Sequence, residues 1–165
     1  MKTLHLMRHA KSDWGSPGLA DRERSLNPRG QRDAPLMGAA LSEVVQAMNI
    51  HVSPARRARM TLAGLCDGWP AMAALDHIVD EDLYTFASDD LVDWLASRPS
   101  ELEAVFIIGH NPALTELTNR LTKSYTVDNL PTAGYVQLSL EIDHWDQLLH
   151  CVASLEHSLL PKQLK

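Results

Sequence analysis

Three short clusters of basic and imidazole side chains in this sequence could bind an anion and react with it. Arg8 and His9 stand side by side near the N-terminus, Arg57 lies in the segment SPARRARMT, and His110 lies in GHNP. A guanidinium is a planar donor suited to phosphate or carboxylate, and an unprotonated imidazole nitrogen is a nucleophile. Each cluster alone is more often part of a solvated loop, but the four side chains together would form a pocket for a phosphoryl group.

The strands that the sequence predicts explain how such distant positions could meet. Each cluster follows the end of one predicted strand: TLHLM (3–7), NIHVS (49–53) and AVFII (104–108). The carboxyl ends of parallel strands lie at one edge of a sheet, where α/β proteins bind their ligands. We therefore expect positions 8, 57 and 110 to meet at that edge.

Helical patterns alternate with these strands. Asn27 and Pro28 open a helix whose apolar spacing runs to Met48, and Ser53 and Pro54 open another that extends to about Cys66. Further helices are expected at 89–97 and after Asn111-Pro112, an irregular segment or short strand at 76–84, and two late antiparallel strands at 135–142 and 147–155. This alternation predicts an α/β sandwich with a largely parallel sheet, in a single domain over residues 1–165.

The charge distribution favours a local anion site. The net charge of −6 argues against nonspecific nucleic-acid binding. Residues 1–59 nevertheless contain ten Lys and Arg against five Asp and Glu, so they carry +5 and the remainder carries −11. The basic side chains therefore concentrate in the part of the chain that contains Arg8 and Arg57.

Other features of the sequence indicate a cytoplasmic protein without metal or cofactor. No apolar run is long enough to span a membrane, and the first ten residues do not form a signal peptide. Cys66 and Cys151 are expected to be reduced thiols in the core. The histidines show no HxH or HExxH spacing, and no GxxxxGK[ST] or GxGxxG loop is present, so we expect no metal site and no bound nucleotide.

Taken together, the three clusters resemble the histidine phosphatase superfamily, which is named for an Arg-His-Gly motif. The chain has Arg-His-Ala instead, which is similar to the small bacterial phosphohistidine phosphatases of the SixA type. The similarity continues through Asp21-x-x-Arg24-x-Leu26, Arg29-Gly30, Ser53-Pro54-x-x-Arg57-Ala58-x-x-Thr61 and Gly109-His110-Asn111-Pro112, and Ala133-Gly134 stands in the reverse of the family's order. The resemblance implies a phosphoglycerate mutase-like fold: a three-layer sandwich with helices on both faces of a mostly parallel sheet, and no cap domain.

The resemblance also implies a role for each site residue. His9 would be the nucleophile that becomes transiently phosphorylated, Arg8, Arg57 and His110 would hold the phosphoryl oxygens, and Arg24 would lie near the pocket. Phosphoryl transfer spreads negative charge over three oxygens in the transition state, so positioned cations supply most of the catalysis. Such a scheme needs no metal, but it needs His9 to be neutral.

A proton donor for the leaving group is harder to find. Asp80, Glu81 and Asp82 are the candidates, with Glu81 named as the possible donor, although a solvated acidic loop is the preferred interpretation. An imidazole, with a pKa of about 6.5, leaves phosphorus more easily than an alkoxide and needs less help from an acid. The loop from Trp14 to Arg24 is expected to be a packed connection rather than a substrate lip.

The sequence therefore predicts a metal-independent phosphatase that acts on phosphohistidine in a phosphotransfer or signalling protein. A phosphatase for small phosphate monoesters is the first alternative, and a non-catalytic phosphate-binding or scaffold protein is the second. No nucleic-acid or membrane partner is expected.

Overall fold

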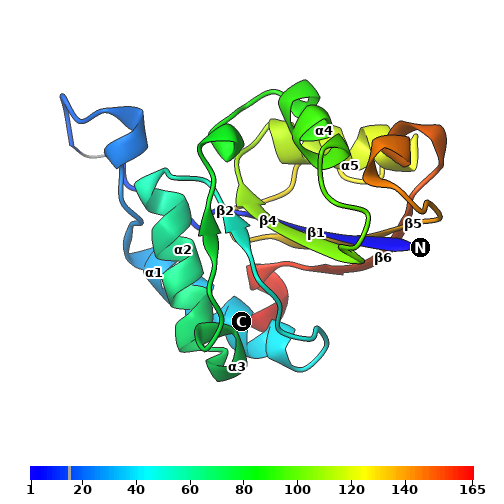
Figure 1. The fold of residues 1–165 in the computed structure, drawn as a ribbon. Helices are drawn as coiled ribbons and strands as arrows, with labels where there is room; N and C mark the ends of the chain where they lie inside the picture. Colours follow the sequence, from blue (N-terminus) through cyan, green and yellow to red (C-terminus); the bar gives the residue numbers. More distant parts are fainter. Residues whose placement is uncertain (15) are drawn as a thin grey trace.

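A six-stranded sheet runs through the centre of the computed structural model, which describes residues 1–14 and 16–165 (Figure 1). The strand order is β3-β2-β4-β1-β5-β6. The four strands β3, β2, β4 and β1 are parallel to one another, and β5 and β6 are antiparallel to their neighbours. The strands are β1 Lys2–Arg8, β2 His51–Val52, β3 Ile78–Val79, β4 Ala104–Gly109, β5 Tyr135–Leu140 and β6 Ser154–Leu159. This arrangement confirms the predicted α/β fold and its largely parallel sheet.

Helices cover both faces of the sheet, as expected for a three-layer sandwich. One face carries α1 (Pro28–Ser42), α2 (Arg56–Asp67) and the short α3 (Pro70–Ala73), and the other carries α4 (Ser88–Ala96) and α5 (Ala113–Thr122) (Figure 1). Short 3₁₀ helices complete the chain: η1 Asp21–Glu23, η2 Glu81–Leu83, η3 Trp145–His150 and η4 Pro161–Leu164. Within the described residues no cap domain follows any strand.

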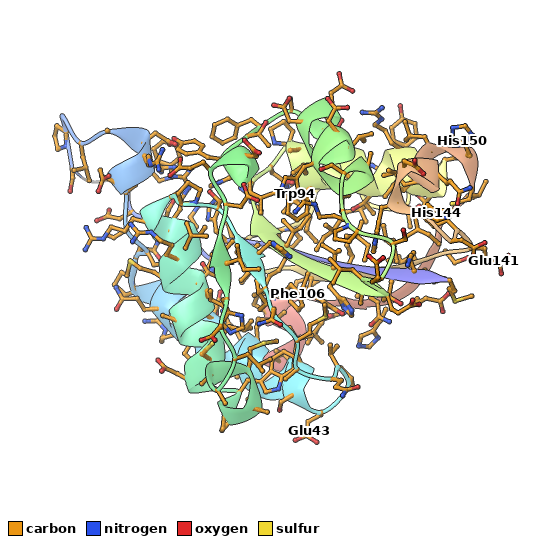
Figure 2. All side chains as sticks on the ribbon, in the orientation of Figure 1. Glu43, Trp94, Phe106, Glu141, His144 and His150 are labelled. Atoms are coloured by element: carbon orange, nitrogen blue, oxygen red, sulfur yellow. The ribbon has the colours of Figure 1, made fainter. Side chains whose placement is uncertain are left out.

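The core consists of two apolar clusters separated by the sheet. Leu4 and Leu6 of β1 belong to one cluster, whereas Met7 belongs to the other, because successive strand side chains point to opposite faces. In Figure 2, Trp94 lies on the α4 side of the sheet and Phe106 on the opposite side, each in its own cluster. Burial on both faces accounts for the continuous apolar run of β4.

Two helix boundaries differ from the prediction. The first helix ends at Ser42 and not at Met48, because the amides of Glu43 and Val44 turn back to Ala40 and Leu41 in a final tight turn. Val45 and Met48 still pack against the core after the helix has ended, so the apolar spacing continued past it. The second helix begins at Arg56 rather than at Pro54.

The second late strand was also predicted in the wrong place. Residues 147–155 were expected to be extended, but Trp145–His150 form η3 and the strand is Ser154–Leu159. Trp145 and Leu148 are both buried in the core, since the turns of η3 carry their side chains inward. Apolar residues in this segment reflect a short helix and not a strand.

The two cysteines lie at the edges of the core and not within it. Cys66 and Cys151 are free thiols, each partly exposed and packed against one apolar cluster. Both thiols were expected in the core, and the structure places them at its margin, free and in contact with it.

None of the helices in the part of the chain described above has the length and apolar character needed to cross a bilayer.

Candidate active site

The carboxyl ends of β1, β2 and β4 meet at one edge of the sheet, as predicted. Arg8 is opposite Gly109 in the β1–β4 register, and Val52 is opposite Ile108 in the β2–β4 register. The chain then leaves β1 through a loop that projects beyond this edge, at the left of Figure 1. The candidate site lies where these three strands end.

Arg57 joins the two candidate histidines. Its Nε donates to Nε2 of His9 at 3.3 Å, and its Nη2 lies 3.3 Å from Nδ1 of His110. The rings of His9 and His110 have centroids 5.3 Å apart. Residues that are 48 and 53 positions apart from Arg57 in the sequence thus surround a single guanidinium.

The imidazole of His9 is buried, with 7% of its surface exposed. Its Nδ1 lies 2.7 Å from the carbonyl oxygen of Ala10, which can only accept, so Nδ1 carries the proton and Nε2 is unprotonated and accepts from Arg57. Burial, aided by the charges of His110, Arg57 and Arg8, lowers the pKa of His9 to about 3, against the raising effect of the Ala10 hydrogen bond. The geometry therefore presents an unprotonated Nε2 next to Arg57.

Thr61 connects the loop of the candidate nucleophile to α2. Its hydroxyl accepts from the amide of Ala10 at 2.9 Å and donates to the carbonyl of Arg57 at 2.7 Å. Ala10 is completely buried, and positive φ angles in the described chain occur only at Gly18, Lys123 and Ala133. Because the backbone at Ala10 is not left-handed, alanine in place of the motif glycine causes no backbone strain there.

The Ala133-Gly134 pair has a structural reason for its order. Ala133 adopts φ 61° and donates its amide to the carbonyls of Arg8 and His9, at 3.1 and 3.0 Å. A Cβ on Gly134 would lie 2.8 Å from the carbonyl oxygen of Pro131, so no other residue fits without a shift. Ala133 therefore adopts the left-handed conformation, which lowers the free energy of unfolding by about 1 kcal/mol.

Arg8 and His110 complete the basic side of the site. Nη1 of Arg8 donates to the carbonyl of Leu130 at 3.0 Å, but its Nε is buried without a hydrogen-bond partner. Nε2 of His110 lies 2.7 Å from the Ser53 hydroxyl, and burial, with the charge of Arg57 second, lowers the pKa of His110 to about 4. A buried donor that lacks a partner fits an anionic oxygen as its acceptor.

Asp21 and Tyr84 lie in the site although neither was among the predicted site residues. The Asp21 carboxylate accepts from Nη2 of Arg57 at 3.0 Å and from the Tyr84 hydroxyl, and its backbone carbonyl accepts from Nη1 of Arg57 at 2.7 Å. The ring of Tyr84 lies 5.5 Å from that of His110. The Asp21-x-x-Arg24 motif contained a signal for Asp21, whereas a lone tyrosine in an acidic segment gave none.

Ser53 was predicted to cap the second helix, and it does something else. Its hydroxyl lies beside His110, and it accepts from the amide of Ala55 at 3.2 Å, one residue before the helix begins. The serine therefore helps to orient His110 instead of opening a helix.

Arg24 lies next to the site, as expected, through its contact with Asp21. Its Nε donates to Oδ1 of Asp21 at 3.2 Å, and its Nη1 donates to the Ser12 hydroxyl at 3.1 Å. The guanidinium stacks on the ring of Trp14, 3.7 Å from its centroid. Trp14 is 74% exposed, so the expectation that it packs inside a connection was wrong.

Two of the three candidate acids at 80–82, Asp80 and Glu81, have carboxylates that are engaged in other contacts. Glu81 forms an ion pair with Arg22, with oxygens 2.6 and 2.8 Å from Nη2. Asp80 accepts from Nε1 of Trp94 at 2.8 Å and from the amide of Asp82 at 2.9 Å. Within residues 1–14 and 16–165, no three His, Cys, Asp or Glu side chains are grouped so that they could hold a metal ion.

Comparison with known families assigns the chain to one of them. Residues 4–104 match the model of the histidine phosphatase superfamily, branch 1. The chain belongs to this superfamily. As a histidine phosphatase it is a phosphate-cleaving hydrolase, and it is 31% identical over 149 residues to an uncharacterized protein of Mycobacterium tuberculosis, a match that covers 84% of this chain and 89% of that protein.

Solved structures share the fold of this histidine phosphatase. The protein histidine phosphatase SixA in complex with tungstate superposes with a TM-score of 0.80 at 21% identity and covers 99% of both chains. A mycobacterial glucosyl-3-phosphoglycerate phosphatase in complex with VO3 superposes with a TM-score of 0.71 at 18% identity, over 95% of this chain and 98% of the other. One fold therefore serves enzymes whose names point to different substrates.

Proposed function

We propose that this histidine phosphatase removes phosphate from phosphohistidine on a phosphotransfer or signalling protein, with His9 as the nucleophile. The observation that carries the proposal is the neutral, buried imidazole of His9, with Nδ1 fixed by Ala10 and Nε2 beside Arg57. A nucleophilic imidazole needs an unprotonated nitrogen and a fixed orientation, and His9 has both.

The phosphoryl oxygens would be held by Arg8, Arg57 and His110. The unpartnered Nε of Arg8 supplies a donor that an oxygen would satisfy, and Arg57 already lies against His9. His110 could donate from a ring nitrogen once it binds a proton, which the negative charge of a phosphoryl group favours. Fixed donors aimed at the developing charge stabilise the transition state without reorganisation.

The reaction would have two steps. Nε2 of His9 attacks phosphorus, the bond from phosphorus to the substrate imidazole breaks, and its electron pair returns to the leaving nitrogen, which takes a proton from water. A water molecule then attacks the phosphorus on His9, the bond to Nε2 breaks, and inorganic phosphate leaves. Neither step requires a metal ion.

Leaving-group chemistry supports phosphohistidine as the substrate. Asp80 and Glu81 are bound to Trp94 and Arg22, and Asp21 is bound to Arg57. Each of these carboxylates is an acceptor in its contact, so none is held as a proton donor. A substrate whose leaving group is an imidazole depends least on such a donor.

The proposal is tested by comparing substrates in the presence of EDTA. A histidine-phosphorylated phosphotransfer domain, 3-phosphoglycerate and an aryl phosphate are assayed with the wild type, and His9→Asn serves as the blank. Fast loss of phosphohistidine, slow loss of the esters and acid-labile phosphate on His9 are expected. Faster turnover of the esters would contradict the substrate assignment, and the absence of turnover and of labelling would favour a phosphate-binding protein without catalysis.

A further inference from the structure

The guanidinium of Arg57 is occupied by a carboxylate of the protein itself. Arg57 is 1% exposed, and His9, Asp21 and His110 accept four hydrogen bonds from it. Two of these four bonds go to Asp21, one to its carboxylate and one to its carbonyl. A carboxylate therefore already accepts from the guanidinium that the proposed function assigns to a phosphoryl oxygen.

The carboxylate of Asp21 is held in place from three sides. Arg57, Arg24 and Tyr84 all donate to it. Burial works to raise the pKa of Asp21, but the hydrogen bonds from Tyr84 and Arg57 outweigh it and lower the pKa. Asp21 is thus ionised wherever the enzyme would be assayed, and its side chain is 45% exposed at the entrance to the site.

A carboxylate in this position has two opposing effects on a phosphate that enters the site. It competes for the donors of Arg57, and it repels the phosphate charge across a few ångströms. It also keeps the long arginine side chain in one orientation. Competition and repulsion weaken phosphate binding, whereas orientation strengthens it, so the sign of the net effect can be measured.

We propose that Asp21 competes with a phosphoryl oxygen for the donors of Arg57 and so limits how tightly phosphate is held. The inference rests on the proposed function, since it requires phosphate to bind at Arg57. Its consequence is a faster release of inorganic phosphate after each turnover, because the carboxylate regains the donors as the product leaves. The enzyme gives up affinity for its product to keep the site open.

The test is the affinity for inorganic phosphate in Asp21→Asn. The amide has the same size and can still accept from Arg57 and Tyr84, but it carries no charge. We expect the competitive inhibition constants of inorganic phosphate and orthovanadate to fall by about tenfold, the effect of removing one nearby like charge from a half-exposed site. KM for the aryl phosphate should fall with them, while kcat should not rise.

Glu23→Gln is the matched control, because Glu23 lies in the same 3₁₀ helix and its loss changes the net charge equally. Its inhibition constants should stay within about twofold of the wild type, as for a screened surface charge. Asp21→Ala removes the charge in a second way and should shift the constants in the same direction.

Unchanged or weaker phosphate binding in both Asp21 variants would overturn the inference and leave Asp21 as a purely structural support for Arg57. Failure of phosphate and orthovanadate to inhibit the wild type at all would instead overturn the proposed function. Calorimetric titration of phosphate into His9→Asn, with and without Asp21→Asn, measures the change in phosphate affinity in the absence of turnover. The two failures are therefore distinguishable.

Discussion

Burial is the main reason why the imidazole of His9 is neutral. Burial lowers its pKa to about 3, and the cations Arg57 and Arg8 work in the same direction. A free histidine loses its nucleophilic electron pair as pH falls through about 6.5. His9 should lose it only as pH approaches 3, so the group remains competent across the mildly acidic range.

We predict that the rate of His9 phosphorylation by an aryl phosphate stays within about twofold from pH 8 to pH 5, after correction for the substrate's own ionisation near pH 6. Rapid-quench trapping of acid-labile phosphate measures this rate. A decline that follows a group with a pKa near 6.5 would show that His9 is not protected from protonation by its surroundings.

Ala133 is the residue at which the backbone of the site is strained. We predict that Ala133→Gly raises the free energy of unfolding by up to about 1 kcal/mol, because glycine adopts the left-handed conformation without steric cost. Gly134→Ala should lower it by more than that, since a Cβ would lie 2.8 Å from Pro131 O. Urea unfolding of both variants measures the two changes, and destabilisation by Ala133→Gly would contradict this account of the pair.

At the scale of elements, η1 and η2 come from distant parts of the chain and are joined by side chains. Arg22 of η1 pairs with Glu81 of η2, and Asp21 accepts from the Tyr84 hydroxyl. The Arg22–Glu81 pair is exposed, so it contributes little to stability. We expect this ion pair to hold η1 and η2 together beside the site and to take no part in catalysis.

We predict that Glu81→Gln retains turnover of phosphohistidine within about threefold of the wild type, because an exposed, ion-paired carboxylate is a poor acid. Arg22→Gln is the matched variant, since it breaks the same ion pair and leaves the carboxylate in place. Steady-state assays of both should give similar values. A loss above about a hundredfold in Glu81→Gln alone would identify Glu81 as the proton donor.

At the scale of the whole molecule, several buried histidines make the fold sensitive to acid. Burial lowers the pKa of His5 to about 4, that of His9 to about 3 and that of His110 to about 4. The unfolded chain binds protons at these residues below about pH 6.5, while the folded protein does not until pH falls toward 4. Stability should therefore be complete above pH 6.5 and decrease as pH falls toward 4.

We predict that the urea midpoint falls steadily between pH 7 and pH 5, with each buried histidine contributing at most about 1.4 kcal/mol per pH unit. His5→Gln should reduce the slope of this decline, whereas replacement of the exposed His150 should leave it unchanged. Equilibrium unfolding at several pH values measures the slope, and a midpoint that is constant over this range would refute the linkage.

The sequence predicted the layers of the molecule and the meeting of Arg8, His9, Arg57 and His110, because strand ends follow from short periodic patterns. It did not predict the roles of Asp21, Tyr84 and Ser53. Asp21 and Tyr84 come from non-periodic segments, and their places depend on how two loops pack against each other, which no local pattern encodes. The helix that was predicted to reach Met48 shows the same limit. Apolar spacing indicates which residues are buried, and residues after the end of this helix are still buried against the core.

The central strand β1 has consequences for synthesis on the ribosome. Its neighbours are β4, whose Ala104 is opposite Thr3, and β5, whose Leu140 is opposite Lys2. A nascent chain emerges N-terminus first. Both edges of this apolar strand therefore stay unpaired until about a hundred further residues have been synthesised. Long-range pairings of this kind form slowly and leave edges open to other chains. Truncated products that stop before β4 should therefore be prone to aggregation and depend on chaperones.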